Sequence, residues 1–317
     1  MKVTDNMIFI LAISLFFTGC TNEEVDKSNT PPIEEYKEIG SGETNGYKLV
    51  WEDLFNENTL DTNNWEPEIY GDGSGNAELE YYRAENISMG NEPLSGKKCL
   101  ILTAKKENFE GRFFTSGRLK TAGKQEFVHG KIEASIKLPK TANGLWPAFW
   151  MLGADYKTNS WPACGEIDIL EMGHSDGIKA NKTERYFNGA CHWGAYHYEN
   201  GNAWYPNYAK ASTAPYSLQD DQFHLFTLIW DEQSIKMYLD LDKHPDTKPY
   251  YELTISETST NDSPGNYFHK KHFILLNLAV GGRFTGILDP TKINALDNGE
   301  AKMYIDFVKV YQKGKNN

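Results

Sequence analysis

The chain has no excess of basic residues, and it has few segments with helical periodicity. Its 317 residues include 32 Lys and Arg against 44 Asp and Glu, which gives a net charge of -12 at pH 7. A chain this acidic binds polyanions poorly, so we expect no nucleic-acid partner. Apolar residues spaced 3.6 apart are scarce, so long helices are not expected. No repeat period is visible either, which argues against propellers and solenoids.

Aromatic residues, in contrast, are abundant. The chain has 8 Trp, 18 Tyr and 16 Phe, together 13% of its residues. Aromatic side chains fill cores, and they also offer flat faces to ligands. Hydrophobic residues make up 39% and charged residues 24%, which is typical of a globular protein and excludes a wholly disordered chain. At roughly 150 residues per domain, the length allows one large domain or two small ones.

Long hydrophobic runs are also missing. The clearest apolar run is short and lies near the N-terminus. Lys2 precedes an apolar run over residues 8–17, which is followed by Gly19 and Cys20. Ten residues are too few for a membrane-spanning helix, which needs about 20, but they fit a signal peptide. A small residue before Cys20 resembles the bacterial lipobox, in which the cysteine carries lipid. We expect a lipoprotein signal peptide over 1–19, with a plain secretory peptide as the alternative.

Residues 20–45 are polar and acidic, and no apolar period runs through them. This composition predicts a disordered tether. Glu23 and Glu24 follow Cys20 closely, which resembles the surface-export signal of lipoproteins in Bacteroidetes-type bacteria; an acidic linker with no such role is the alternative. We therefore expect an outer-membrane lipoprotein at the cell surface that touches the membrane only through the lipid on Cys20.

The cysteine count excludes a disulfide framework. If Cys20 carries lipid, only Cys99, Cys164 and Cys191 remain. An odd number of thiols cannot all pair. We expect all three to be free and buried, as small hydrophobic residues, with a disulfide between Cys164 and Cys191 as the alternative.

Residues 46–314 have the pattern of one all-β domain. Short segments of strand propensity, such as 98–105, 131–137 and 272–280, are separated by turn residues. Strands do not alternate with helices, which argues against a parallel α/β sheet. We expect a two-sheet antiparallel β-jelly-roll sandwich with a concave substrate cleft, and a monomer.

The most informative segment is residues 165–171 (GEIDILE). Glu166 and Asp168 are two apart, so on a strand they share a face. Glu171 is five residues from Glu166, so in a regular strand it would face the core, where a lone carboxylate is costly. One extra residue, a β-bulge around Ile169 and Leu170, would return Glu171 to the face of the other two.

Three carboxylates on one face raise each other's pKa, which suits acid/base chemistry better than structure. Such a cluster can hold a protonated acid beside an ionised nucleophile. A solvated edge strand is the first alternative, but the apolar flanking residues fit it badly. A calcium site is the second, but calcium usually binds in a loop. We therefore interpret Glu166, Asp168 and Glu171 as catalytic.

This segment resembles the E-[ILV]-D-x-x-E signature of glycoside hydrolase family 16. Further matches occur in order along the domain, over residues 49–55 (LVWEDLF), 75–82 (GNAELEYY), 115–119 (TSGRL), 144–153 (GLWPAFWMLG), 192–194 (HWG), 277–282 (NLAVGG) and 303–312 (MYIDFVKVYQ). The resemblance implies that Glu166 is the nucleophile, Glu171 the general acid/base, and that Asp168 tunes both. It also implies retention of configuration, through carboxyl groups about 5–5.5 Å apart, and no cofactor for catalysis.

The same resemblance implies a set of substrate-binding residues. Trp146, Trp150 and Trp161 would stack on sugar rings, although core packing is the alternative for Trp150. The others would contact sugar hydroxyls or border the cleavage point; they are Asn76, Glu78, Arg118, His192 and Trp193. Arg118 could instead pair with the catalytic carboxylates. The alternatives are turn chemistry for Asn76 and Glu78, a surface position for Arg118 and a core position for His192. A structural calcium ion, with Asp306 and Glu52 as ligands, is a further expectation; a solvated carboxylate is the alternative.

The expected function is endo-acting hydrolysis of β-1,3 or mixed β-1,3/1,4-glucan. A galactan such as agarose is an alternative substrate for the same chemistry. A sulfated carrageenan would need several basic residues in the cleft, and Arg118 is the clear one. A non-catalytic glucan-binding lipoprotein is the alternative of another class, but it would lose the catalytic carboxylates, and this chain keeps all three. A metal-dependent lyase is disfavoured because no histidine cluster has ligand spacing.

Overall fold

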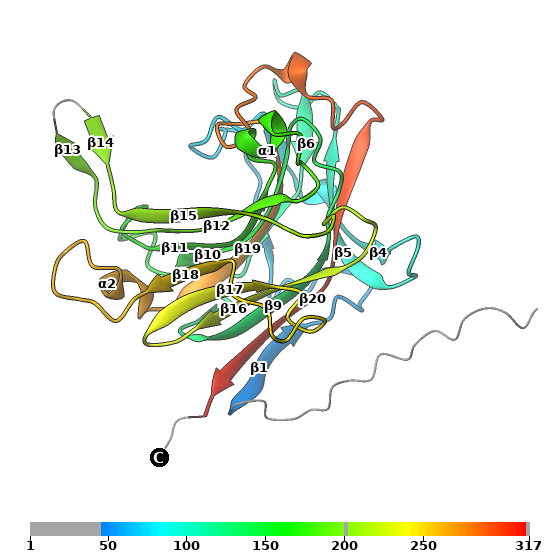
Figure 1. The fold of residues 1–317 in the computed structure, drawn as a ribbon. Helices are drawn as coiled ribbons and strands as arrows, with labels where there is room; N and C mark the ends of the chain where they lie inside the picture. The colour runs from blue at the N-terminus through cyan, green and yellow to red at the C-terminus, as the bar shows by residue number, and fades with distance from the viewer. Residues whose placement is uncertain (1–45, 200–201, 315–317) are drawn as a thin grey trace, which may run out of the picture. The chain divides into compact units, whose positions relative to one another are not determined.

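The computed structural model describes residues 46–199 and 202–314, and these residues form two large β-sheets (Figure 1). The helical elements are short: α1 (Ser175–Lys179), α2 (Gly265–Phe268), and the 3-10 turns η1 (Ala84–Asn86) and η2 (Pro290–Lys292). None of the helices in the described residues is long and apolar enough to cross a bilayer. The predicted signal peptide over 1–19, the tether over 20–45 and the lipidated Cys20 all lie outside the described residues.

The first sheet has ten strands. Eight follow the order β18-β17-β16-β9-β20-β5-β6-β3, while β1 pairs with β20 and β4 with β5. All pairs are antiparallel except β3 with β6. The strands are β1 (Tyr47–Asp53), β3 (Glu80–Tyr82), β4 (Ile87–Asn91), β5 (Lys98–Lys105), β6 (Phe114–Ser116), β9 (Gly130–Lys137), β16 (His224–Trp230), β17 (Ser234–Leu239), β18 (Tyr251–Thr254) and β20 (Glu300–Lys313).

The second sheet has eight strands and is antiparallel throughout. Its order is β15-β12-β11-β10-β19-β7-β2, with β8 paired to β19. The strands are β2 (Glu66–Pro67), β7 (Arg118–Lys120), β8 (Glu126–Phe127), β10 (Leu145–Gly153), β11 (Glu166–Met172), β12 (Tyr186–His192), β15 (Asn207–Thr213) and β19 (His272–Val280). A separate hairpin, β13 (His197–Glu199) with β14 (Asn202–Trp204), projects at the upper left of Figure 1.

The core lies between the two sheets and is rich in aromatic residues. Its largest fully buried aromatic side chains come from both sheets and from the loops between them: Trp65, Trp230, Tyr251, Phe55, Phe114, Phe149, Phe187, Phe226 and Phe268. Alternation along each strand sends one set of side chains to this layer and leaves the opposite set for the outer faces. The predicted antiparallel jelly-roll sandwich is confirmed, and part of the aromatic excess is explained by this core.

The three cysteines of the domain are free and buried, as predicted: Cys99, Cys164 and Cys191. Each lies in a strand or close to one. Burial raises the pKa of the Cys99 and Cys164 thiols to about 12, so neither is a reactive thiolate at neutral pH.

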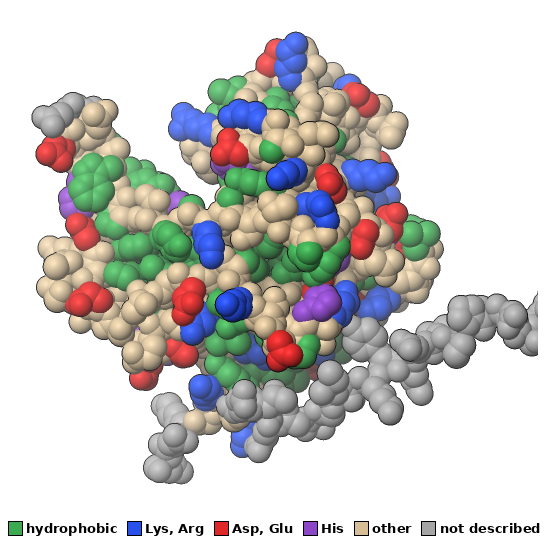
Figure 2. Space-filling view, viewed as in Figure 1, with side chains coloured by type: hydrophobic (Ala, Val, Ile, Leu, Met, Phe, Trp, Pro, Cys, Tyr) green, Lys and Arg blue, Asp and Glu red, His purple; other side chains and the backbone are tan. Residues whose placement is uncertain are grey.

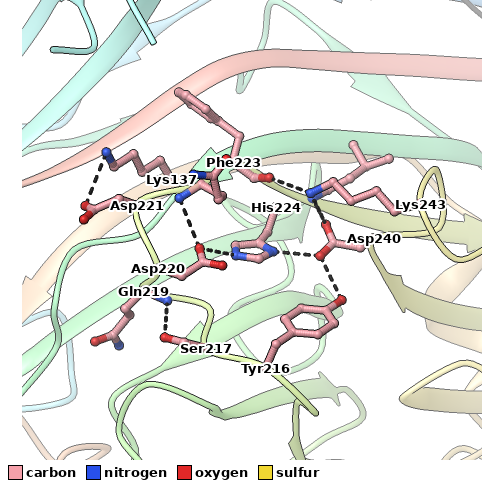
Figure 3. A network of polar contacts seen from close by, with 12 residues as sticks. Lys137, Tyr216, Ser217, Gln219, Asp220, Asp221, Phe223, His224, Asp240 and Lys243 are labelled. Carbon is pink, nitrogen blue, oxygen red and sulfur yellow. Dashed lines mark hydrogen bonds and ion pairs between the residues drawn. The ribbon is translucent and has the colours of Figure 1, made fainter. Parts of the chain in front are cut away.

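A buried polar network joins the start of β16 to the end of β17 (Figure 3). His224 Nδ1 lies 2.7 Å from Asp240 Oδ2, and its Nε2 lies 3.1 Å from Asp220 Oδ1. Tyr216 donates its hydroxyl to the same Asp240 Oδ2 at 2.8 Å. His224 and Asp240 are only 2% and 1% exposed. A charged pair buried to this extent needs several hydrogen-bond partners, because burial removes its contacts with water.

Candidate active site

Strand β11 carries the three predicted carboxylates, and it contains the predicted bulge. Against β10, Phe149 pairs with Leu170 and the next residue, Trp150, pairs with Asp168. Ile169 therefore has no partner in this ladder, and the pairing with β12 shifts over the same stretch. One unpaired residue restores Glu171 to the face of Glu166 and Asp168. The bulge that the spacing of the carboxylates predicted is confirmed.

The other face of β11 is buried in the core. Ile167, Ile169 and Leu170 have no exposed surface. Glu166 and Glu171 are partly buried, whereas Asp168 between them is 5% exposed. The sandwich core holds the strand rigidly from one side, so the carboxylates on the other side are fixed in position.

Burial sets the protonation of this cluster. It raises the pKa of Glu166 to about 7 and that of Glu171 to about 8. It also raises the pKa of Asp168 well above its usual range, helped by the charges of the two glutamates. The Arg118 charge and a hydrogen bond from Trp161 act in the opposite direction on Glu166. Near neutral pH the cluster therefore holds protons and carries fewer than three negative charges.

Trp146 holds Glu171. Its indole Nε1 donates a hydrogen bond to Glu171 Oε1 at 3.1 Å. The ring stacks on Phe284, with centroids 4.5 Å apart and planes 10° from parallel. Trp146 is 9% exposed, so it supports the carboxylate more than it offers a free face to a sugar. Phe284 was not predicted, because it lies in the irregular segment after β19.

His192 stands beside the other two carboxylates. It pairs with Glu166 across β11 and β12. Its Nε2 lies 3.4 Å from Asp168 Oδ2 and 4.0 Å from Glu166 Oε1. Burial lowers the pKa of His192 to about 4, so the imidazole is neutral near pH 7. The predicted position of His192 at the catalytic residues agrees with this geometry.

Aromatic rings surround His192 and form one flank of the site. Trp161 is 37% exposed, and its ring lies 4.8 Å from Tyr205 and 6.0 Å from both His192 and Tyr196. Tyr196 and Tyr205 were missed by sequence reasoning because they lie in irregular segments next to the projecting hairpin. Figure 2 shows a hollow between this hairpin and the region of α1. We expect Trp161 to offer a face to a sugar ring.

Arg118 lies on the other side of the site, in β7. It does not pair with a catalytic carboxylate; its Nε lies 2.6 Å from Glu68 Oε2. Its guanidinium sits 4.9 Å above the Trp150 ring, and Trp150 donates to Asn277 Oδ1 at 2.7 Å. Glu68 was not singled out from the sequence, since it follows the two-residue strand β2 and belongs to no recognisable motif.

Two predicted substrate contacts need correction. Glu78 is 3% exposed, and its carboxylate accepts the Tyr82 hydroxyl at 2.8 Å. Trp193 is 7% exposed, and its indole donates to the Asp262 carbonyl at 2.8 Å while the ring packs against Phe268. Both side chains are thus part of the interior. Asn76 is exposed, as a contact residue should be, but it lies in a turn outside the strands.

The predicted calcium ligands are not brought together either. Glu52 lies opposite Lys309 in the β1–β20 ladder, with 3.6 Å between carboxylate and ammonium. Asp306 is three residues from Lys309, and Lys97 Nζ lies 2.5 Å from its Oδ2. Calcium needs six to eight oxygen ligands, whereas each of these carboxylates forms an ion pair with a lysine. These two residues therefore do not fit a shared calcium site.

Comparison with known proteins agrees with this geometry. The family model of glycosyl hydrolases family 16 matches residues 76–252. The beta-glucanase of Rhodothermus marinus is 30% identical, over 98% of this chain and 96% of that protein. The glucan endo-1,3-beta-glucosidase A1 of Niallia circulans is 30% identical over 89% of this chain, which spans 41% of the length of that relative.

A solved structure extends the likeness to three dimensions. The GH16 protein of the Bacteroides ovatus mixed linkage glucan PUL, in complex with the product G4G4G3G, is 40% identical. The match covers 82% of this chain and 99% of the other, with a TM-score of 0.70. Catalysis in this family needs no cofactor. The chain belongs to the glycosyl hydrolases of family 16.

Proposed function

We propose that this protein is an endo-acting β-glucanase that cleaves β-1,3-glucan, mixed-linkage β-1,3/1,4-glucan, or both. The observation that carries the proposal is the carboxylate cluster on β11, which the Ile169 bulge turns to one face. Aromatic side chains flank it, with Trp146 at Glu171 and Trp161 near His192. Flat rings favour sugars with equatorial hydroxyls, because axial groups prevent close contact with a ring face.

Glu166 attacks the anomeric carbon and forms a glycosyl-enzyme ester. Glu171 gives its proton to the leaving glycosidic oxygen, and its pKa of about 8 keeps that proton in place at neutral pH. Water, deprotonated by the same Glu171, then releases the sugar with retained configuration. Burial and the charges of the two glutamates raise the pKa of Asp168 well above its usual range, so a protonated Asp168 can donate a hydrogen bond to the ionised nucleophile.

The substrate assignment is supported by the relatives. The Rhodothermus marinus protein is a beta-glucanase, and the Bacteroides ovatus structure holds a mixed-linkage glucan product. Internal cleavage needs sugar-binding surface on both sides of the cutting point. The exposed Trp161 offers a ring face on the Glu166 side, where it lies near His192. A galactan such as agarose remains the alternative substrate, and the product test below distinguishes it.

We also propose that the protein is a monomeric outer-membrane lipoprotein at the cell surface, anchored by lipid on Cys20. The support is the sequence alone: an apolar run of ten residues, Gly19 before Cys20, and the acidic pair Glu23 and Glu24. Labelled fatty acid should enter the wild-type protein and not Cys20→Ala, which should leave the membrane fraction with its hydrolytic activity intact. Wild-type protein without label would contradict the anchor.

Chromatography of early products from laminarin, barley β-glucan, lichenan and agarose tests the function. We expect short oligosaccharides from laminarin or the mixed-linkage glucans, no action on cellulose, and no products from Glu166→Gln. Glucose as the sole early product would contradict the endo mode. Cleavage of agarose without cleavage of any glucan would replace the substrate assignment.

A further inference from the structure

Three metal-ligating side chains converge at one end of the carboxylate cluster. Glu166, Asp168 and His192 each place one ligand atom within 4.8 Å of the other two. They come from neighbouring strands, since Glu166 of β11 pairs directly with His192 of β12. Imidazole nitrogen and carboxylate oxygen are both ligand types that zinc binds in proteins.

The spacing of these atoms fits a small dication. Tetrahedral ligands about 2.1 Å from a zinc ion are about 3.4 Å apart. His192 Nε2 lies 3.4 Å from Asp168 Oδ2, which is this separation. The same nitrogen lies 4.0 Å from Glu166 Oε1, so a small rotation of the partly buried Glu166 side chain would complete the set. Calcium is a poorer match, because it takes six to eight oxygens and rarely an imidazole.

A second observation also indicates a ligand here. The Asp168 side chain is 7% exposed, and its Oδ2 has no hydrogen-bond partner among the described residues. This oxygen points to His192, whose own Nδ1 is likewise without a partner within the described part of the chain. A buried polar atom without a partner costs free energy, and a bound cation would remove that cost for Asp168.

We propose that Glu166, Asp168 and His192 form an inhibitory binding site for a divalent transition-metal ion, with Zn²⁺ as the probe. The ion takes one oxygen of each carboxylate and the Nε2 of His192, and water completes its coordination. Glu166 then cannot attack the anomeric carbon, so metal and glucan exclude each other. The inhibition rests on the proposed hydrolytic function, whereas the binding of metal does not.

Titration calorimetry with Zn²⁺ and the absorption spectrum of bound Co²⁺ test the site directly. The full chain is used with Cys20→Ala in every variant, because a free thiol also binds zinc. We expect one Zn²⁺ per chain, and binding at least about tenfold weaker in both Asp168→Asn and His192→Gln. His197→Gln is the matched control. His197 lies 2.8 Å from the Asp262 carboxylate, so this pair offers two ligands instead of three. The His197→Gln variant should bind Zn²⁺ as the wild type does.

Hydrolysis provides the second readout. Zn²⁺ should raise the KM for glucan without changing kcat, and the chelator EDTA should reverse the effect. Hydrolysis with no binding of Zn²⁺, or equal binding by wild type and both site variants, would overturn the metal site. Zn²⁺ binding that depends on Asp168 and His192 in a protein that cleaves no polysaccharide would instead overturn the proposed function and leave the metal site standing. Circular dichroism of each variant shows whether it is folded.

Discussion

Trp146 donates a hydrogen bond to Glu171, and the same indole stacks on Phe284. One tryptophan thus fixes the proposed acid/base in position and adjusts its acidity. The hydrogen bond stabilises the ionised carboxylate, so it lowers the pKa of Glu171 against the larger, opposite effect of burial. This hydrogen bond connects Glu171, which follows the bulge in β11, to Trp146 of the neighbouring strand β10.

Trp146→Phe should keep the stacking and lose the hydrogen bond. The pKa of Glu171 should then rise, so the acid stays protonated to higher pH and the alkaline limb of kcat/KM moves upward. We expect kcat near neutral pH to fall by about tenfold or more, because the carboxyl is less well oriented. Trp150→Phe is the control, since its indole bonds to Asn277 and not to Glu171. An equal shift of the limb in both variants would contradict the role of Trp146.

Glu166→Gln and Glu171→Gln should each fold and lose nearly all hydrolysis of polysaccharide, by a factor of about 10³ or more. They should differ on an aryl glycoside with an activated leaving group. That substrate needs no proton on departure, so Glu171→Gln should regain its first step while Glu166→Gln should not. For the wild-type enzyme, NMR of the first products should show the β-anomer, because the mechanism retains configuration. Undiminished turnover of polysaccharide in either variant would disprove the assigned roles.

The cluster should also destabilise the fold as pH rises. Each carboxyl has a higher pKa in the folded than in the unfolded protein. For the two glutamates the cost is absent below about pH 4 and grows as pH rises through their folded pKa values of about 7 and about 8. Glu171→Gln should therefore be more stable than wild type at pH 8.5, by about 1–3 kcal/mol, and similar to it at pH 4. Urea unfolding at the two pH values measures this. Glu57→Gln, at an exposed position, should show no such change.

The His224 network should have the opposite pH dependence. Burial alone would lower the pKa of His224, but hydrogen bonds and charge from Asp240 outweigh it and raise the pKa. The stabilisation is thus complete below the unfolded value of about 6.5 and is lost as pH rises through the folded value. His224→Gln should cost about 2–4 kcal/mol at pH 5.5 and less at pH 9. The partly exposed pair of His197 and Asp262 should contribute below about 1 kcal/mol. A loss in His197→Gln as large as that in His224→Gln would argue against the network.

Local spacing along one strand was sufficient to predict the centre of the site. Glu166, Asp168 and Glu171 could be placed on one face because a buried lone carboxylate is costly, and that argument required the bulge at Ile169. Glu78 and Trp193 were misplaced because their facing depends on which strand or loop packs against them. Tyr196 and Tyr205 reach Trp161 through irregular segments, and no periodicity in the sequence reports such contacts.

In a regular strand, the number of residues determines which face of the sheet each side chain lies on. The unpaired Ile169 removes this dependence in β11. In a regular strand, an insertion of one residue turns every later side chain over. Here the extra residue is absorbed where the ladder shifts, and Tyr250 donates its hydroxyl to the freed carbonyl of Ile169. The number of residues between Glu166 and Glu171 can therefore change by one while both side chains stay on the same side of the sheet. A fully buried core face and an adjustable spacing of the two glutamates can thus coexist in a single strand.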